Sequence, residues 1–343
     1  MAFDYVFSAR KVAGDQFLAE PGPMRFLKVP RKSLTCSPNY AIPVKDWAAE
    51  LQGLAYANEN PYSVSPSGDI LIFVHGYNND QTVILQRLRQ LQKDLRAEGW
   101  RGAVAAFDWP SDNRTLNYLE DRSDAAEVAH KLVADGIVRL SARQKAGCET
   151  NIHLLGHSTG AYVIMEAFEQ AQKLGSLYKA DWRVGQVAFI GGDVSSESLS
   201  ITSDWAKPFY SRIMRLTNYV NPFDSVLGVS NAKRLGVAPR AGRSGLALPF
   251  HPKAIDVDCG PYFESLNPKT SVQIGSWTHS WHIGNRVFAR DLAMTMEGAI
   301  DRQSITTRVR GPDSRMQLQD SPRPKNQLSW GIKEEAQRQN ARA

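Results

Sequence analysis

The chain has 343 residues, of which 42% are hydrophobic and 22% charged, an ordinary balance for a soluble globular enzyme. No apolar run approaches the roughly 20 residues that cross a bilayer, and the N-terminus lacks the basic and apolar regions of a secretory signal. The formal net charge is +6, but nine Lys or Arg and five Asp or Glu place +4 of it between Asp301 and Ala343. We therefore expect no integral membrane segment and no nucleic-acid partner.

Cys36, Cys148 and Cys259 are odd in number and widely spaced, and they lack the spacing of metal ligands. This pattern favours free thiols in a reducing cytoplasm. We expect neither a metal nor an organic cofactor.

The N-terminal residues 1–68 predict short strands at Tyr5–Phe7 and Met24–Val29, which we expect to form the outer antiparallel edge of a sheet. From residue 69, apolar runs alternate with helical periodicity. Further strands are expected at 70–74, 103–107, 152–155, 187–190, 213–217 and 254–258. Helices are expected after the first three of these strands, the second spanning about 123–143. This alternation predicts an α/β fold with a mainly parallel central sheet and helices on both faces.

This pattern divides the chain into three segments. Residues 1–68 form the N-terminal segment with edge strands, residues 69–298 the catalytic domain, and residues 299–343 a polar, basic, flexible tail. Residues 227–267 are rich in Gly, Pro and Arg and are expected to be an insertion near the site.

The candidate catalytic motif lies around Ser158. An apolar strand leads into Gly156-His157-Ser158-Thr159-Gly160, and an apolar-periodic helix follows. A serine between two glycines can occupy a sharp, strained strand-to-helix turn that exposes its hydroxyl to a cleft. Ser158 is therefore the predicted nucleophile.

Such a serine needs an imidazole to take its proton and a carboxylate to orient that imidazole. His279 and His282 follow the last predicted strand, and we favour His279. For the acid we favour Asp224, after the fifth strand, over Asp193, after the fourth; both positions can reach the histidine of a triad.

An oxyanion hole requires two preorganised N–H donors. The amide of Thr159 directly follows the nucleophile, and the amide of Tyr77 lies in the loop after the first buried strand. The side chains beside these groups are predicted to contact substrate: His75, Asn78, Trp109 and His157.

Five motifs occur in the order found in the α/β-hydrolase superfamily. They are residues 75–79 (His-Gly-Tyr-Asn-Asn), 108–111 (Asp-Trp-Pro-Ser), 156–160 (Gly-His-Ser-Thr-Gly), 221–224 (Asn-Pro-Phe-Asp) and 278–281 (Thr-His-Ser-Trp). The set resembles a bacterial branch of unassigned function, over about residues 69–285. The resemblance implies an α/β-hydrolase fold with an eight-stranded core, and a triad of Ser158, Asp224 and His279.

The sequence thus predicts a serine hydrolase that cleaves a carboxylic ester or thioester, with a small-molecule or lipid ester as substrate. Two alternatives stay open: an acyltransferase that uses the same triad, and a catalytically silent binding protein of the same fold.

Overall fold

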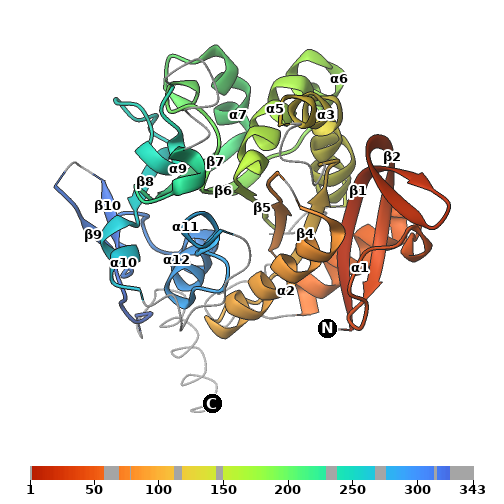
Figure 1. The fold of residues 1–343 in the computed structure, drawn as a ribbon, viewed down its shortest axis with the longest axis horizontal. Helices are drawn as coiled ribbons and strands as arrows, with labels where there is room; N and C mark the ends of the chain where they lie inside the picture. Colours follow the sequence, from red (N-terminus) through yellow and green to blue (C-terminus); the bar gives the residue numbers. More distant parts are fainter. Residues whose placement is uncertain are drawn as a thin grey trace, which may run out of the picture.

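A computed structural model describes the chain over residues 2–57, 69–77, 79–111, 118–143, 150–228, 238–266, 276–312 and 315–324. The strands form a single ten-stranded sheet in the order β2-β1-β4-β3-β5-β6-β7-β8-β10-β9 (Figure 1). Their bounds are β1 Phe3–Ala13, β2 Gln16–Pro30, β3 Ile70–Val74, β4 Ala103–Asp108, β5 Ile152–His157, β6 Val184–Ile190, β7 Ile213–Val220, β8 Ala254–Asp258, β9 Arg308–Arg310 and β10 Met316–Leu318. The eight strands from β1 to β10 in this order pair in parallel, and β2 and β9 close the two edges antiparallel to their neighbours.

Helices cover both faces of the sheet, as the alternating pattern predicted (Figure 1). The α-helices are α1 Val44–Ala57, α2 Gln81–Ala97, α3 Tyr118–Lys131, α4 Val138–Ser141, α5 Thr159–Lys173, α6 Ser176–Lys179, α7 Lys207–Arg212, α9 Ala241–Ser244, α10 Gly260–Glu264, α11 Trp277–Ser280 and α12 Arg286–Glu297. Short 3₁₀ turns lie at Pro38–Tyr40, Glu197–Leu199 and Asp204–Ala206. Among the described helices, none has the length and apolar character required to span a membrane.

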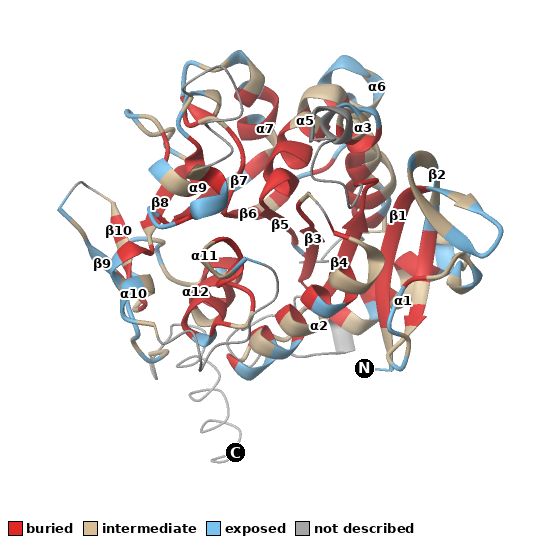
Figure 2. Ribbon diagram, in the orientation of Figure 1, coloured by how far each residue is buried: buried red, intermediate tan, exposed pale blue. Residues whose placement is uncertain are grey.

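Strand β3 shows why both faces carry helices. All five of its residues are buried, and successive side chains of a strand point to opposite faces. Ile70, Ile72 and Val74 join the apolar core that α1, α3, α5 and α7 share, whereas Leu71 and Phe73 join the core under α2 and α12. Figure 2 shows the central strands as buried along their length, which is expected of a parallel sheet enclosed between helical layers.

Two elements differ from their predicted form. The N-terminal strands were expected to be an antiparallel edge, and β1 and β2 do pair in that way, but β1 also joins β4 in parallel register, with Tyr5 opposite Ala105. The helix expected at about 123–143 begins at Tyr118 as α3 and passes through a π-helical segment, Leu132–Ile137, before α4.

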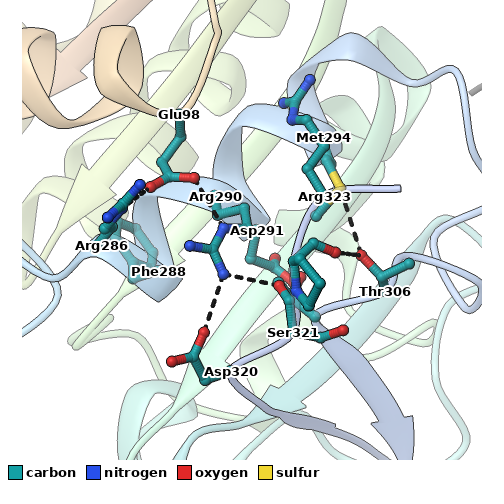
Figure 3. A network of polar contacts seen from close by, with 12 residues as sticks. Glu98, Arg286, Phe288, Arg290, Asp291, Met294, Thr306, Asp320, Ser321 and Arg323 are labelled. Atoms are coloured by element: carbon teal, nitrogen blue, oxygen red, sulfur yellow. Dashed lines mark hydrogen bonds and ion pairs between the residues drawn. The ribbon is translucent and has the colours of Figure 1, made fainter. Parts of the chain in front are cut away.

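Part of the tail that was expected to be flexible belongs to the fold. Strands β9 and β10 lie within it, and Met316 pairs with Val257 of β8 in parallel register. The residues after β10 are held on α12: Arg290 contacts Glu98, just after α2, at 2.8 Å, Asp320 at 3.0 Å and the Ser321 carbonyl at 2.8 Å (Figure 3). The polar composition misled the prediction because these strands have only three residues each. Only Met316 and Leu318 of β10 enter the apolar core, and the other anchors are ion pairs.

A buried ion pair fastens β9 to α12. Arg308 and Asp291 are both inaccessible to solvent, with Arg308 Nε donating to Asp291 Oδ2 at 2.9 Å. Tyr219 Oη and Thr307 Oγ1 also donate to this carboxylate, at 2.6 and 2.7 Å. We expect Arg308→Met to lower the free energy of unfolding by about 3–5 kcal/mol, because it leaves a buried carboxylate without its cation. Urea unfolding measures this; Arg310→Met, an exposed position on the same strand, is the control, and equal losses in the two variants would contradict the prediction.

A second buried carboxylate, Asp256 of β8, makes stability depend on pH. It accepts hydrogen bonds from Asn218 Nδ2 at 2.8 Å and the Leu246 amide at 2.9 Å, yet burial raises its pKa from 3.8 to about 6. The folded state therefore keeps this proton up to about pH 6, whereas the unfolded chain releases it near pH 4, so this group's contribution to stability falls as pH rises between those values. We expect the stability of Asp256→Asn relative to the native protein to increase by about 2 kcal/mol from pH 4 to pH 7. Unfolding at several pH values measures this difference, and a difference that stays constant with pH would contradict it.

Candidate active site

Ser158 lies at the turn between β5 and α5, at the carboxyl edge of the sheet. Its backbone has φ 55° and ψ −124°, and it is the only non-glycine residue of the described chain with positive φ. Such a conformation costs free energy for an L-residue and is maintained only where the surroundings enforce it. The turn is tight: a β-carbon on Gly160 would lie only 2.2 Å from the Val74 carbonyl oxygen of β3. Any larger residue there would force β3 and α5 apart.

The imidazole of His279 contacts the carboxylate of Asp224 at this edge. His279 Nδ1 lies 2.6 Å from Asp224 Oδ2, and both side chains are buried. The other carboxylate oxygen, Oδ1, accepts the Leu227 amide at 3.0 Å. Two more contacts join the loops that carry the pair: Asn221 Nδ2 donates to the Thr278 carbonyl at 2.9 Å, and the Ser225 and Thr278 hydroxyls lie 2.6 Å apart.

The loop after β6 connects the serine to this pair. The Ser158 amide donates to the Ile190 carbonyl at 3.0 Å, and the next residue, Gly191, packs so closely on the His279 ring that a β-carbon there would lie 2.9 Å from Nδ1. The ring of His157, which precedes the serine, is centred 4.9 Å from the His279 ring. The hydroxyl, imidazole and carboxylate favoured from sequence are thus brought to one edge of the sheet.

The two alternative residues have other surroundings. The Asp193 carboxylate lies 3.3 Å from Arg240 Nε, in an ion pair with the segment before α9. His282 is 1% exposed and packs among Trp281, Phe288 and Tyr219. Neither of its ring nitrogens has a hydrogen-bond partner within the described ranges, and burial holds its pKa well below 6.5. The contact with an acid distinguishes His279 from His282, and the contact with a histidine distinguishes Asp224 from Asp193.

The loop that follows β3 passes directly over Ser158. A β-carbon on Gly76 would lie 2.7 Å from the Ser158 β-carbon, so only glycine fits there. Asn79 Nδ2 donates to the carbonyls of Gly76 at 2.6 Å and Tyr77 at 3.0 Å, which fixes the direction of the peptide groups in this loop. The half-buried Tyr77 lies on this loop, and Thr159 is the first residue of α5. Asn78 lies outside the described residues.

Three of the side chains that were expected to contact substrate are turned into the protein. His75 and Trp109 are fully buried with stacked rings, and His157 is 2% exposed. The Trp109 amide donates to His75 Nε2 at 3.2 Å, which leaves Nδ1 as the protonated nitrogen of a neutral ring that donates to the Gly76 carbonyl at 2.8 Å. Burial lowers the pKa of His75, in agreement with this neutral form. These rings lie behind the loop and are closed off from solvent.

Arg10 of β1 was missed by the sequence analysis. Its guanidinium is 2% exposed and donates to Asp108 Oδ1 at 2.6 Å, to the Ser111 carbonyl at 3.1 Å and to the Asn79 carbonyl at 3.0 Å. Although burial alone would raise the pKa of Asp108, the charge of Arg10 lowers it to about 2. The loops after β3 and β4 are therefore fixed to the N-terminal hairpin. The sequence signal was weak: Ser8 and Arg10 are polar residues of the strand, but so are Asp4 and Lys11.

Within the described ranges, no three His, Cys, Asp or Glu side chains converge as metal ligands do. A strained serine after a parallel strand, close to a histidine–carboxylate pair at the same sheet edge, is the arrangement of the α/β-hydrolase class. The chain belongs to the family described as alpha/beta hydrolase of unknown function (DUF900), whose model matches residues 59–246. The predicted α/β-hydrolase fold and superfamily are thereby confirmed.

No curated protein matches the chain. Among solved structures it is similar to carboxyl esterase 2 from the fungus Tuber melanosporum, with 12% identity over 86% of this chain and 87% of that one and a TM-score of 0.38. It is also similar to a cutinase-like protein from Cryptococcus sp., with 16% identity over 69% of this chain and 97% of that one and a TM-score of 0.34. An esterase from Pyrobaculum calidifontis has 12% identity over 76% of this chain and 94% of that one, with a TM-score of 0.34.

Proposed function

We propose that this member of the α/β-hydrolase family is a serine hydrolase that cleaves a carboxylic ester or thioester through an acyl-enzyme. The observation that carries the proposal is the 2.6 Å contact between His279 and Asp224 at the sheet edge where Ser158 holds its strained turn. A histidine whose Nδ1–H is held by a carboxylate presents its other nitrogen as a base, which is what a serine hydroxyl requires in order to attack at neutral pH.

In the first half of the reaction, Ser158 Oγ attacks the carbonyl carbon while its proton passes to Nε2 of His279. The oxyanion of the tetrahedral intermediate accepts hydrogen bonds from the amides of Tyr77 and Thr159. The carbon–oxygen or carbon–sulfur bond then breaks, and the leaving alcohol or thiol takes the proton from His279. Asp224 stabilises the imidazolium and does not itself take the proton.

In the second half, His279 takes a proton from water, and the resulting hydroxide attacks the acyl-enzyme. Collapse of this second intermediate breaks the bond to Ser158 Oγ, which regains its proton from His279, and releases a carboxylic acid. We assign His75, Trp109 and His157 to the support of the oxyanion loop and the serine turn.

We retain the prediction of a cytoplasmic location; the two described cysteines, Cys36 and Cys259, are buried free thiols.

Labelling with a fluorophosphonate tests the proposal, because this reagent phosphonylates only serines activated by a base. We expect the full chain to incorporate one equivalent, and peptide mapping to locate it on Ser158. A folded protein that stays unlabelled while a reference serine esterase reacts under the same conditions would overturn the proposal. A series of p-nitrophenyl esters of increasing acyl length then identifies the preferred substrates.

A further inference from the structure

A buried arginine lies directly behind the serine turn. Arg87 of α2 is 4% exposed, and it occupies the same helix face as Ile84, Leu88 and Leu91, which pack under the sheet. An arginine within the apolar face of a helix carries a large desolvation cost, so a contact specific to this position is expected.

The contacts of Arg87 lead to both sides of the site. Its Nη1 lies 3.0 Å from His157 Nδ1, and its Nη2 donates to the Ser280 hydroxyl at 3.3 Å. Because a guanidinium can only donate, His157 Nδ1 must accept, and the proton of this neutral ring is on Nε2. His157 Nε2 in turn lies 3.4 Å from Ser280 Oγ. Arg87 therefore fixes the residue before the nucleophile and the residue after the base in one set of contacts.

The same ring touches the oxyanion loop. A β-carbon on Gly76 would lie 2.9 Å from His157 Nδ1, the nitrogen that Arg87 contacts, and 2.7 Å from the Ser158 β-carbon. The guanidinium and the loop that carries the Tyr77 amide thus approach the same nitrogen of one imidazole.

The charge on Arg87 persists at this buried position. Burial lowers its pKa to about 10, which still leaves the guanidinium protonated at neutral pH. Burial and the neighbouring Arg87 hold the pKa of His157 well below 6.5, so His157 stays neutral. The result is one fixed positive charge close to the place where the oxyanion develops, in surroundings where charges are weakly screened.

We propose that Arg87 is a positioning residue whose buried positive charge, held against His157, supports the oxyanion that forms at Ser158. This inference rests on the proposed serine-hydrolase function. Arg87, on α2, would act on the transition state through its contact with His157. Arg87 itself touches no reacting atom.

Arg87→Met and Arg87→Lys test this role, with Arg89→Met as the matched control. Arg89 lies on the same helix but pairs with Asp4 of β1 at 2.8 Å, away from the site. Fluorophosphonate titration gives the number of active serines in each preparation, so that rates are expressed per active site and any misfolded fraction is excluded. Hydrolysis of a p-nitrophenyl ester gives kcat and KM, and a boronic acid serves as an analogue of the anionic intermediate.

For Arg87→Met we expect kcat per active site to fall about tenfold to thirtyfold with KM within twofold, less than the loss of a direct oxyanion donor. The boronic acid should bind more weakly by a similar factor, and the loss should persist from 50 to 500 mM NaCl. Arg87→Lys should recover part of the rate, and Arg89→Met should behave like the native protein.

Unchanged kcat in Arg87→Met, a loss in KM alone, or an Arg87→Lys variant as slow as Arg87→Met would overturn the inference while leaving the hydrolase function intact. A native protein that neither reacts with the fluorophosphonate nor hydrolyses any ester would overturn both.

Discussion

Replacing Ser158 by alanine should lower kcat/KM for ester hydrolysis by about 10⁴-fold or more. In enzymes of this mechanism the nucleophile and its base act as a unit, and the loss of either leaves only the slow reaction that the oxyanion hole and binding can support. Steady-state hydrolysis of the best p-nitrophenyl ester, with the rate in buffer subtracted, measures this loss. The variant should fold normally, because alanine retains the β-carbon and removes only the hydroxyl.

A matched control is available in Ser244. It also lies close to two glycines, Gly242 and Gly245, but it ends the short helix α9 rather than following a parallel strand, and it is exposed. We expect Ser244→Ala to retain full activity. If Ser158→Ala kept more than a tenth of the native kcat/KM, the nucleophile would have to be sought elsewhere.

Replacing Asp224 by asparagine should lower kcat by about 10³- to 10⁴-fold. The amide has nearly the shape of the carboxylate, but its NH₂ group can donate to Nδ1 of His279 and so stabilise the tautomer that cannot take the proton of the serine. The imidazolium that forms during the reaction also loses its counter-charge. The measurement is kcat on the same ester. Thermal unfolding shows independently whether the variant is folded.

Asp193→Asn separates the two acids that the sequence left open. Its carboxylate faces Arg240 at 3.3 Å, so its replacement should affect stability more than the chemical step. We expect its kcat to remain within about tenfold of the native value. The reverse ranking, with Asp193→Asn the slower variant, would transfer the acid's role to Asp193.

The central fold was predictable because its signal is local. The β3 run Ile70–Val74 and the strand–serine–helix pattern around Ser158 each fit within about 15 residues. In contrast, the choice of acid and base depended on contacts between loops 55 residues apart, such as His279 with Asp224. Sequence order restricted the candidates to two for each role, but it could not tell which histidine would meet a carboxylate and which would be enclosed by aromatic rings.

The contacts that the sequence did not reveal are polar and distant. Arg10 meets Asp108 across 98 residues, and Arg87 meets Ser280 across 193. Nothing in the periodicity of either segment specifies such a partner. Strands β9 and β10 escaped prediction because three residues are too few to establish alternation. The contact of Arg308 with Asp291, which holds β9, is equally distant in sequence terms from any local pattern.

The anchoring of the loop after β3 by Arg10 bears on how the protein can be shortened. The family match begins at residue 59, yet the side chain that neutralises Asp108 comes from residue 10. A fragment cut at the family boundary would enclose a carboxylate with no counter-ion and would expose the edge of β4 that β1 covers, which invites self-association. We therefore expect the smallest stably folded unit to include the N-terminal hairpin.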